Sequence, residues 1–318
     1  MRFSTIGYGL LALLALAAPF LGIYPVFGMQ LLCFAMFACA FNLLLGYSGM
    51  LSFGHAAYFG FASYITSWLI VAHHWNTVES ILAGVVASAL LGLVIGAIAI
   101  RRQGIYFAMT TLALGQLVYF LCLQAPFTGG ENGIQGVSRG SFLGLVTLRD
   151  DVNMYYFVLA IFVAIYLFIH RIINSPYGQV LKAIRENEPR AVSLGYQVDR
   201  YKLLAFVLSA AIAGLAGSLK ALSLGLASLS DVLQGTSGEV ILMTLLGGTG
   251  TFFGPVLGAG VVIALQHYLS DIAGDWVTVI IGVIFVACVM LFRRGMVGEF
   301  VAWLERSGQA ESPQSKGP

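Results

Sequence analysis

Long apolar runs recur along the whole chain, and they constrain the fold more than any other feature. A transmembrane helix needs about 20 mainly apolar residues, because each residue advances the helix by about 1.5 Å. The runs predict an all-α, polytopic membrane protein with about ten transmembrane helices and some glycine-broken segments. The expected spans cover residues 6–24, 28–45, 55–72, 81–100, 105–124, 154–170, 203–222, 240–252, 256–269 and 276–292.

The composition agrees with a membrane environment. Of the 318 residues, 59% are hydrophobic and 9% are charged, whereas soluble domains carry about 25% charged residues. A soluble protein of this size has no means of covering so much apolar surface. Lipid and neighbouring helices are therefore expected to surround most side chains. The net charge of +2 is too small to indicate nucleic acid as a partner.

Basic residues are sorted by their position between the expected spans. If the amino terminus is cytoplasmic, the outer segments hold Arg139 and Arg149, with Lys220 near the outer end of the seventh span. Basic residues favour the cytoplasmic side of a membrane, so the pattern predicts that both termini are cytoplasmic. The inner segments hold the other thirteen: Arg2, Arg101, Arg102, Arg171, Lys182, Arg185, Arg190, Arg200, Lys202, Arg293, Arg294, Arg306 and Lys316.

Two parts of this layout have an alternative. The beginning of the chain, with Arg2 and the small residues at 15–17, also resembles a cleavable signal peptide, although the apolar run continues towards Tyr24 as in a retained span. The eighth and ninth runs are short and glycine-rich, so they are either full spans or two half-helices that enter from one side. Residues 1–306 are expected to form the transmembrane domain, and residues 307–318 a disordered cytoplasmic tail.

Two glycine-rich segments interrupt the apolar pattern, at residues 46–55 and 247–255. Both read Leu-Gly-x-Ser/Thr-Gly and continue to Phe-Gly, which is a weak internal similarity. Broken helices at membrane depth occur where protein or a watery cavity covers the backbone, and paired breaks point to a translocation path. The alternatives are close helix packing, hydroxyls bonded to their own helix, and structural contacts for the polar side chains. The pathway candidates are Asn42, Ser48, Gly49, Ser52, His55, Thr249, Gly250 and Thr251.

The longest inner segment, residues 174–202, carries signals for two short helices. Ser175 is expected to cap the first, with Pro176 at its first position, and Gly195 to end the second. Apolar positions form one edge of each helix beside charged residues. Such a segment lies on the membrane or docks on a partner; the alternative is a solvated basic loop.

Several chemistries lack their sequence signals. The chain has no phosphate-binding loop, no HExxH and no GxSxG motif. Its four cysteines lie singly in apolar runs, so neither a metal site nor a disulfide is predicted. No span carries the paired carboxylates of a proton relay, and Glu239 has no evident partner. An enzyme is therefore not expected, and any energy from ATP must come from another subunit.

Five sequence patches, in order along the chain, resemble one family. They are FNLLLGYSGMLSFGHAAY (41–58), GIYFAM (104–109), TGGENG (128–133), SPYG (175–178) and RENEPRA (185–191). The chain is similar to the branched-chain amino acid ABC permeases of the LivM type, over roughly residues 30–295. The resemblance implies an importer subunit of the bacterial inner membrane. Its partners would be a second, LivH-type permease, two cytoplasmic ATPase subunits and a periplasmic solute-binding protein.

The same resemblance gives the inner segment a role. Residues 174–202 are similar to the coupling region by which permeases of this kind contact their ATPases, although the Glu188-Pro189 pair departs from the plain Glu-Ala-Ala motif. No cofactor is expected in the chain itself, since ATP would bind to the partner subunits. The coupling candidates are Val180, Leu181, Ile184, Arg185, Glu188, Ala191, Leu194 and Gly195.

The expected mechanism is alternating access, in which ATPase closure moves the inner segment and the spans open a central cavity to either side in turn. Each ligand must then bind one state better than the other. Urea and amide permeases look similar, so the solute is open among branched-chain amino acids, urea, amides and other small amino acids. The alternatives in other classes are an ion-coupled secondary transporter, a membrane scaffold and a membrane enzyme.

Overall fold

The computed structural model describes residues 24–142 and 146–291, and the first expected span and the tail lie outside these ranges. Each of the second to tenth expected spans corresponds to a helix. The expected and the observed bounds differ most where a helix continues into polar residues, as at the start of α9. The helices are α2 (Pro25–Asn42), α3 (Ala56–His73), α4 (Thr77–Ala99), α5 (Ile105–Gln124), α6 (Asp151–Asn174), α9 (Val198–Leu224), α10 (Gln234–Gly247), α11 (Gly254–Ala273) and α12 (Val277–Leu291).

The helices confirm an all-α, polytopic membrane protein. Within the described ranges, five helical segments are long and apolar enough to cross a bilayer by themselves: Pro25–Tyr47, α4, α5, α6 and α9. α10 has 14 residues and is about 21 Å long, shorter than a hydrocarbon core of about 30 Å. Its length favours a half-helix for the eighth run alone, because α11 has 20 residues and is about 30 Å long. The pair of half-helices therefore stays a prediction. The total of ten spans and the orientation of the termini stay predictions.

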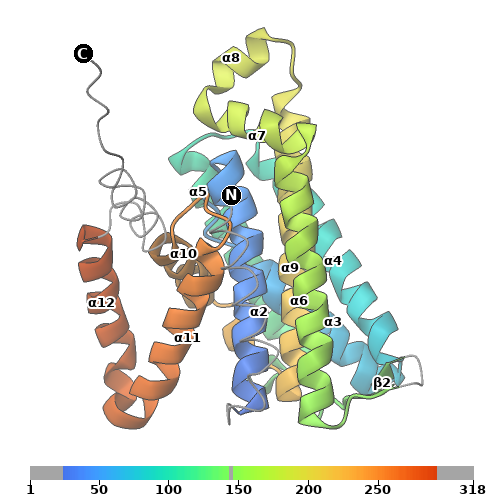
Figure 1. Cartoon of the computed structure of the whole chain (residues 1–318). Helices are drawn as coiled ribbons and strands as arrows, with labels where there is room; N and C mark the ends of the chain where they lie inside the picture. The colour runs from blue at the N-terminus through green and yellow to red at the C-terminus, as the bar shows by residue number, and fades with distance from the viewer. Residues whose placement is uncertain (1–23, 143–145, 292–318) are drawn as a thin grey trace, which may run out of the picture.

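The longest helix, α9, lies at the centre of the bundle and packs against α2, α3 and α4 (Figure 1). Small residues allow this close approach. A Cβ atom on Gly92 of α4 would lie 2.4 Å from the Cβ atom of Ala210 on α9. Ser88 of α4 donates a hydrogen bond of 2.7 Å to the carbonyl of Ala210. Membrane helices associate through such small residues and short polar bonds. On α4 a buried small residue recurs on every turn, at Gly84, Ser88, Gly92 and Gly96.

The two ends of the bundle differ. At one end lie the short helices α7 (Pro176–Glu186) and α8 (Glu188–Ser193). The opposite end holds small elements that apolar runs do not predict, including β2 (Figure 1). Two antiparallel pairs form there: β1 (Ile134–Gln135) with β4 (Leu226–Ala227), and β2 (Ser141–Phe142) with β3 (Val146–Thr147). Within the described ranges, the short 3-10 helices are η3 (Pro126–Thr128), η4 (Gly130–Asn132), η5 (Leu229–Asp231) and η6 (Gly274–Trp276).

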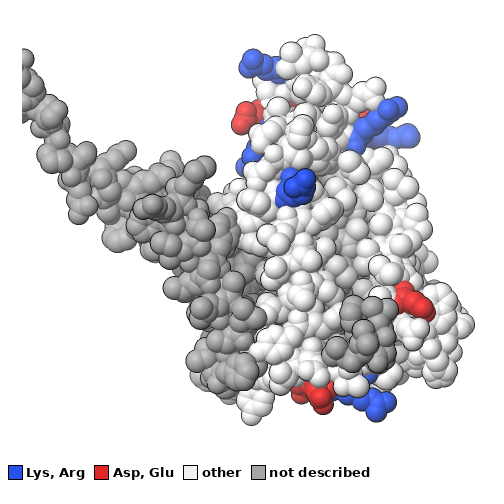
Figure 2. Space-filling view, turned by 45° about the vertical axis from the view of Figure 1, so that its right-hand side comes forward, with Lys and Arg blue, Asp and Glu red and all other residues white. Residues whose placement is uncertain are grey.

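Charge follows this division. Figure 2 shows most of the visible Lys and Arg side chains at the end that carries α7 and α8. At the other end Arg139 pairs with Asp151 at 2.5 Å. The bundle therefore separates charge along its length, as an orientation with α7 and α8 in the cytoplasm requires.

Candidate functional site

The first glycine-rich segment breaks the helix between α2 and α3. α2 continues as the π-helix η2 (Leu43–Tyr47), and residues 49–55 then lead to α3. π-helical turns are rare and frequently mark functional sites. The backbone N–H of Phe53 donates to Thr111 Oγ1 at 3.2 Å, and that of Ala56 donates to Ser237 Oγ at 2.9 Å. Side chains of α5 and α10 thus satisfy the freed backbone, as a break at membrane depth requires.

The second glycine-rich segment joins α10 to α11. Gly248 and Gly250 adopt positive φ angles of 110° and 76°, which side chains disfavour. The hydroxyl of Thr251 donates to the carbonyl of Gly248 at 2.7 Å and accepts from the N–H of Gly254 at 3.1 Å. The turn is therefore held by its own hydroxyl, which is the local alternative expected for these residues.

The two breaks meet at one place, which we call the glycine junction: Asn42, Gly46, Gly250 and Thr251. The side-chain amide of Asn42 accepts a 2.9 Å hydrogen bond from the N–H of Gly250 and donates a 2.9 Å bond to the carbonyl of Thr251. A Cβ atom on Gly46 would lie 2.7 Å from the nitrogen of Gly250. Three predicted pathway residues are thus in one contact, in which Asn42 acts as an interhelical bridge.

The other pathway candidates take no part in the hydrogen bonds of the junction. Ser48 donates to the carbonyl of Leu44 in its own helix at 2.5 Å. Ser52 is fully buried, and its hydroxyl has no hydrogen-bond partner within the described residues. Thr249 is half-buried. None of these positions by itself identifies a solute path.

His55 is fully buried and serves helix packing in this structure. Its ring centre lies 5.6 Å from that of Phe37 and 5.3 Å from that of Phe41. Its Nε2 lies 3.2 Å from the hydroxyl of Ser209, which donates to the carbonyl of Ala40 at 2.5 Å. Because that hydroxyl proton is already used, Nε2 carries the hydrogen and donates to Ser209. These contacts favour the packing interpretation, while Nδ1 has no hydrogen-bond partner within the described residues.

The inner segment forms the two short helices that the sequence predicts. The side chain of Ser175 accepts from the N–H of Gly178 at 3.3 Å and caps α7, with Pro176 at the start. Asn187, which the sequence reasoning missed, caps α8 by accepting from Arg190. Gly195 follows α8 with a positive φ angle of 86°. These caps define a folded segment, residues 174–202, rather than a solvated loop. We call it the coupling region after its predicted role.

Most apolar coupling candidates face the chain itself. Leu181, Ile184 and Ala191 are buried, and the last two pack with Val198 at the start of α9. In contrast, Leu194 is 68% exposed and its neighbour Val192 is 57% exposed. The apolar surface that remains available for another protein therefore lies on and after α8.

An ion pair ties the coupling region to the bundle. Lys202 Nζ lies 2.6 Å from Glu188 Oε1, and the same oxygen accepts from Gln103 Nε2 at 3.1 Å. Lys202 is buried, so its charge depends on this partner. The contact joins α8, α9 and the turn between α4 and α5.

A cavity of about 480 Å³ opens beside this ion pair. Its walls combine the first glycine break, the α4–α5 turn and the coupling region, and include both charged and apolar side chains. Predicted pathway and predicted coupling residues thus share one space. The residues that line this cavity include Ser48, Gly49, Phe53, Arg102, Gln103, Arg185, Glu188 and Lys202.

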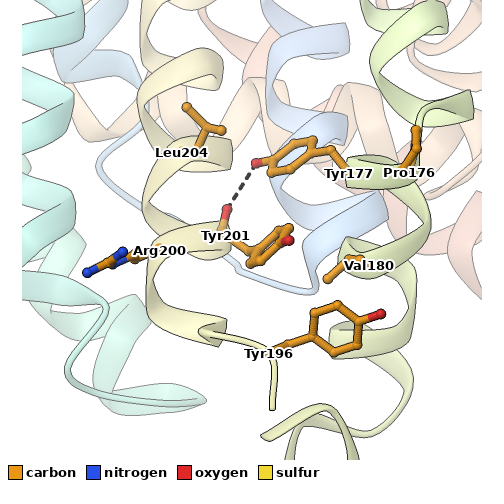
Figure 3. Close-up of a pocket in the computed structure, with 7 residues that line it drawn as sticks. All are labelled: Pro176, Tyr177, Val180, Tyr196, Arg200, Tyr201 and Leu204. Atoms are coloured by element: carbon orange, nitrogen blue, oxygen red, sulfur yellow. Dashed lines mark hydrogen bonds between the residues drawn. The ribbon is translucent and has the colours of Figure 1, made fainter. Parts of the chain in front are cut away.

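A second cavity, of about 510 Å³, lies between α7 and the start of α9 (Figure 3). Val180 lines it together with three tyrosines. The hydroxyl of Tyr177 donates to the carbonyl of Tyr201 at 2.9 Å, and the two rings stack with centres 5.6 Å apart. Burial and the neighbouring Tyr201 raise the pKa of Tyr177 above its ordinary value, so the phenol stays a neutral donor. The stacked rings fix α7 on α9.

Two polar contacts near the other end escaped the sequence reasoning. Lys220 pairs with Asp231, and both residues are buried. Glu239, which had no evident partner, accepts from Gln266 at 3.1 Å. A lysine inside an apolar span needs a partner, and that rule is the signal that could have found the first pair. Within the described ranges, no group of three or more His, Cys, Asp or Glu residues could hold a metal ion.

Comparison with known proteins places this arrangement in a family. The model of the family described as "Branched-chain amino acid transport system / permease component" matches residues 27–289. No solved structure matches the chain.

Three curated relatives illustrate the similarity. The chain is 28% identical to the high-affinity branched-chain amino acid transport system permease protein LivM of Salmonella typhimurium, over 96% of this chain and 78% of that protein. It is 29% identical to LivM of Escherichia coli, over 82% of this chain and 67% of that protein. It is 22% identical to the high-affinity branched-chain amino acid transport system permease protein LivH of Salmonella typhimurium, over 83% of this chain and 91% of that protein. The chain therefore belongs to the family of branched-chain amino acid transport permeases and is of the LivM type.

Proposed function

We propose that the chain is a permease subunit of an ATP-binding cassette importer that moves leucine, isoleucine and valine across the bacterial inner membrane. The family match over residues 27–289 carries this proposal, because it covers the breaks, the junction and the coupling region together. The relatives are named as permease proteins, and these names give no catalytic role. ATP hydrolysis is accordingly assigned to other subunits.

The proposed partners are a second permease of the LivH type, two cytoplasmic ATPase subunits and a periplasmic solute-binding protein. The similarity to a LivH protein supports a pair of homologous permeases. The exposed Val192 and Leu194 support a docked ATPase, since apolar side chains at a basic, membrane-proximal end are otherwise left in water.

The proposed mechanism is alternating access. The coupling region contacts the first break through the shared cavity, and Asn42 joins the first break to the second. A movement of α7 and α8 therefore reaches both breaks through contacts within one chain. ATP binding shifts the population of two states only if the ATPases contact those states differently.

Two other solute assignments remain in the same importer class, namely urea or amides and other small amino acids. An ion-coupled secondary transporter is the alternative from another class. In the described part of the spans, Lys220 pairs with Asp231 and Glu239 bonds with Gln266, so these charges have partners inside the chain. None of these paired groups is therefore free to act as the proton relay of a secondary transporter.

Uptake by the reconstituted complex tests the proposal. Proteoliposomes would contain this chain, its permease partner and the ATPases, with ATP inside and a loaded binding protein outside. We expect ATP-dependent uptake of labelled leucine, with competition from valine and isoleucine but not urea. Uptake of urea in place of leucine would overturn the solute, and uptake by the lone chain under an ion gradient would overturn the class.

Charged substitutions test the docking surface. Val192→Glu together with Leu194→Glu should release the ATPases on co-purification while the chain still inserts, because both side chains are exposed. Ala183→Glu, at an exposed position on α7, is the matched control and should retain them. Equal retention of the ATPases by the double variant and the control would contradict docking at this surface.

A further inference from the structure

Arg185 belongs to the coupling helix α7, yet its side chain reaches both glycine breaks. Its Nη1 donates a hydrogen bond to the carbonyl of Gly46, at the end of the first break's helix. A Cβ atom on Gly250, in the second break, would lie 3.1 Å from the same nitrogen. A Cβ atom on Gly49 would lie 3.2 Å from Arg185 Cγ. One side chain of the coupling region therefore lies against both breaks.

The chemistry of this contact suits a cation. Gly46 lies in the last turn of a helix, where carbonyls lack partners within the helix and carry the negative end of its dipole. One turn earlier on α7, Lys182 Nζ lies 5.9 Å from the ring centre of Tyr47, within reach of a cation–π contact. Positions 182 and 185 share one face of α7. That face thus presents two cations to the end of the π-helix.

Among the residues that the structure describes, no carboxylate pairs with Arg185 to explain its position otherwise. The ion pairs within the described ranges are Arg139 with Asp151, Lys202 with Glu188, and Lys220 with Asp231. The guanidinium is thus held by the Gly46 carbonyl on the wall of the 480 Å³ cavity. A lysine in its place would offer a point charge without the planar fork of donors.

We propose that Arg185 is the positioning residue that transmits movement of the coupling region to both glycine breaks; this role rests on the proposed function. When α7 moves, the bond to Gly46 carries the end of α2 with it. Asn42 then carries the α10–α11 connection, because it is bonded to Gly250 and Thr251. Because Gly49 and Gly250 have no side chains, the side chain of Arg185 has space to lie against both breaks. Movement of the coupling region thereby changes both breaks together.

The test compares Arg185→Gln, Arg185→Lys and the control Arg171→Gln, an arginine that is exposed like Arg185 but lies in the last turn of α6, outside the coupling helices. In proteoliposomes with the partner subunits, leucine uptake and ATP hydrolysis would be measured together. We expect Arg185→Gln to retain assembly and ATP hydrolysis but to lose about tenfold in leucine moved per ATP. Arg185→Lys should recover part of this ratio, and Arg171→Gln should match the unmodified chain. An unchanged ratio in Arg185→Gln would overturn the proposal.

Hydrogen exchange on the purified chain alone separates this role from the assignment of the solute. Arg185→Gln should speed exchange about tenfold or more at residues 43–54 and 248–254, whereas Arg171→Gln should leave both segments protected. Faster exchange with no leucine uptake by the unmodified complex would support the Arg185 contact and reject the solute. Unchanged exchange at residues 248–254 would overturn the contact whatever the solute is.

Discussion

Replacing Asn42 with alanine removes the α2 side chain that hydrogen-bonds the backbone of both Gly250 and Thr251 in the second break. The amide accepts from Gly250 and donates to Thr251, each at 2.9 Å, and Asn42 is 4% exposed. Alanine has the same helix preference or better, so α2 itself should persist. The substitution therefore isolates the contact between the two breaks.

The magnitude follows from the two hydrogen bonds. Interhelical bonds in membranes contribute about 0.6 kcal/mol on average, with a maximum of about 1.7 kcal/mol. A buried backbone group left without a partner costs about 1–3 kcal/mol in soluble proteins. Two interhelical bonds within the membrane range correspond to about 1–3 kcal/mol. At about 2–4 °C per kcal/mol, the value for soluble chains of 150–250 residues, we expect the midpoint of thermal unfolding to fall by roughly 2–12 °C.

The assay is thermal unfolding of the purified chain in detergent, followed by the reaction of buried cysteines with a thiol dye. Cys33, Cys39 and Cys122 are buried and report on opening of the core. Asn153→Ala is the matched control, because that asparagine bonds to the carbonyl of Thr147 at an exposed site. If Asn42→Ala and Asn153→Ala unfold at the same temperature, the junction does not stabilise the chain and the reasoning is refuted.

Two further substitutions test the packing of the bundle. Gly217→Ala should destabilise the chain by about 3 kcal/mol and lower the yield of folded protein, because its Cβ would lie 1.9 Å from a backbone oxygen of α3; Gly238→Ala, with open space around it, should match the unmodified chain, and equal losses would contradict this packing. Lys220→Met should cost about 3–5 kcal/mol by leaving Asp231 charged and unpaired. Adding Asp231→Leu should restore much of the folded fraction on size-exclusion chromatography, and no recovery would argue against the pair.

The sequence predicts individual helices well, because apolar runs reflect their lipid or protein surroundings. α5 begins and ends at the expected residues, Ile105 and Gln124. α9 begins earlier than expected, at Val198, because its first turn carries Asp199 and Arg200, which a search for apolar runs excludes. The caps of α7 were predictable because a hydroxyl and a proline act on their own turn.

Contacts between distant segments were not predictable in the same way. Asn42 and Gly250 are separated by 208 positions, and a single sequence shows only that each segment is unusual. The weak similarity between the two breaks gives no geometry for their meeting. Arg185 was assigned to the coupling region from its motif, but the reach of its side chain into the breaks depends on how α7 packs.

A helix-interface pattern on α4 was present in the sequence but was not predicted. Gly84, Ser88, Gly92 and Gly96 recur every four residues and are all buried. That period places small residues on one helix face, which is typical of a membrane helix interface. The partner, α9, follows only from the structure.

Accessibility of the coupling region tests the central claim most directly, since no cytoplasmic ATPase can contact a segment outside the cell. Arg190→Cys on α8 and Arg149→Cys at the opposite end would each be treated with a membrane-impermeant maleimide. The account predicts labelling of Arg149→Cys in intact spheroplasts and labelling of Arg190→Cys only after the membrane is opened. Labelling of Arg190→Cys in intact spheroplasts would contradict it.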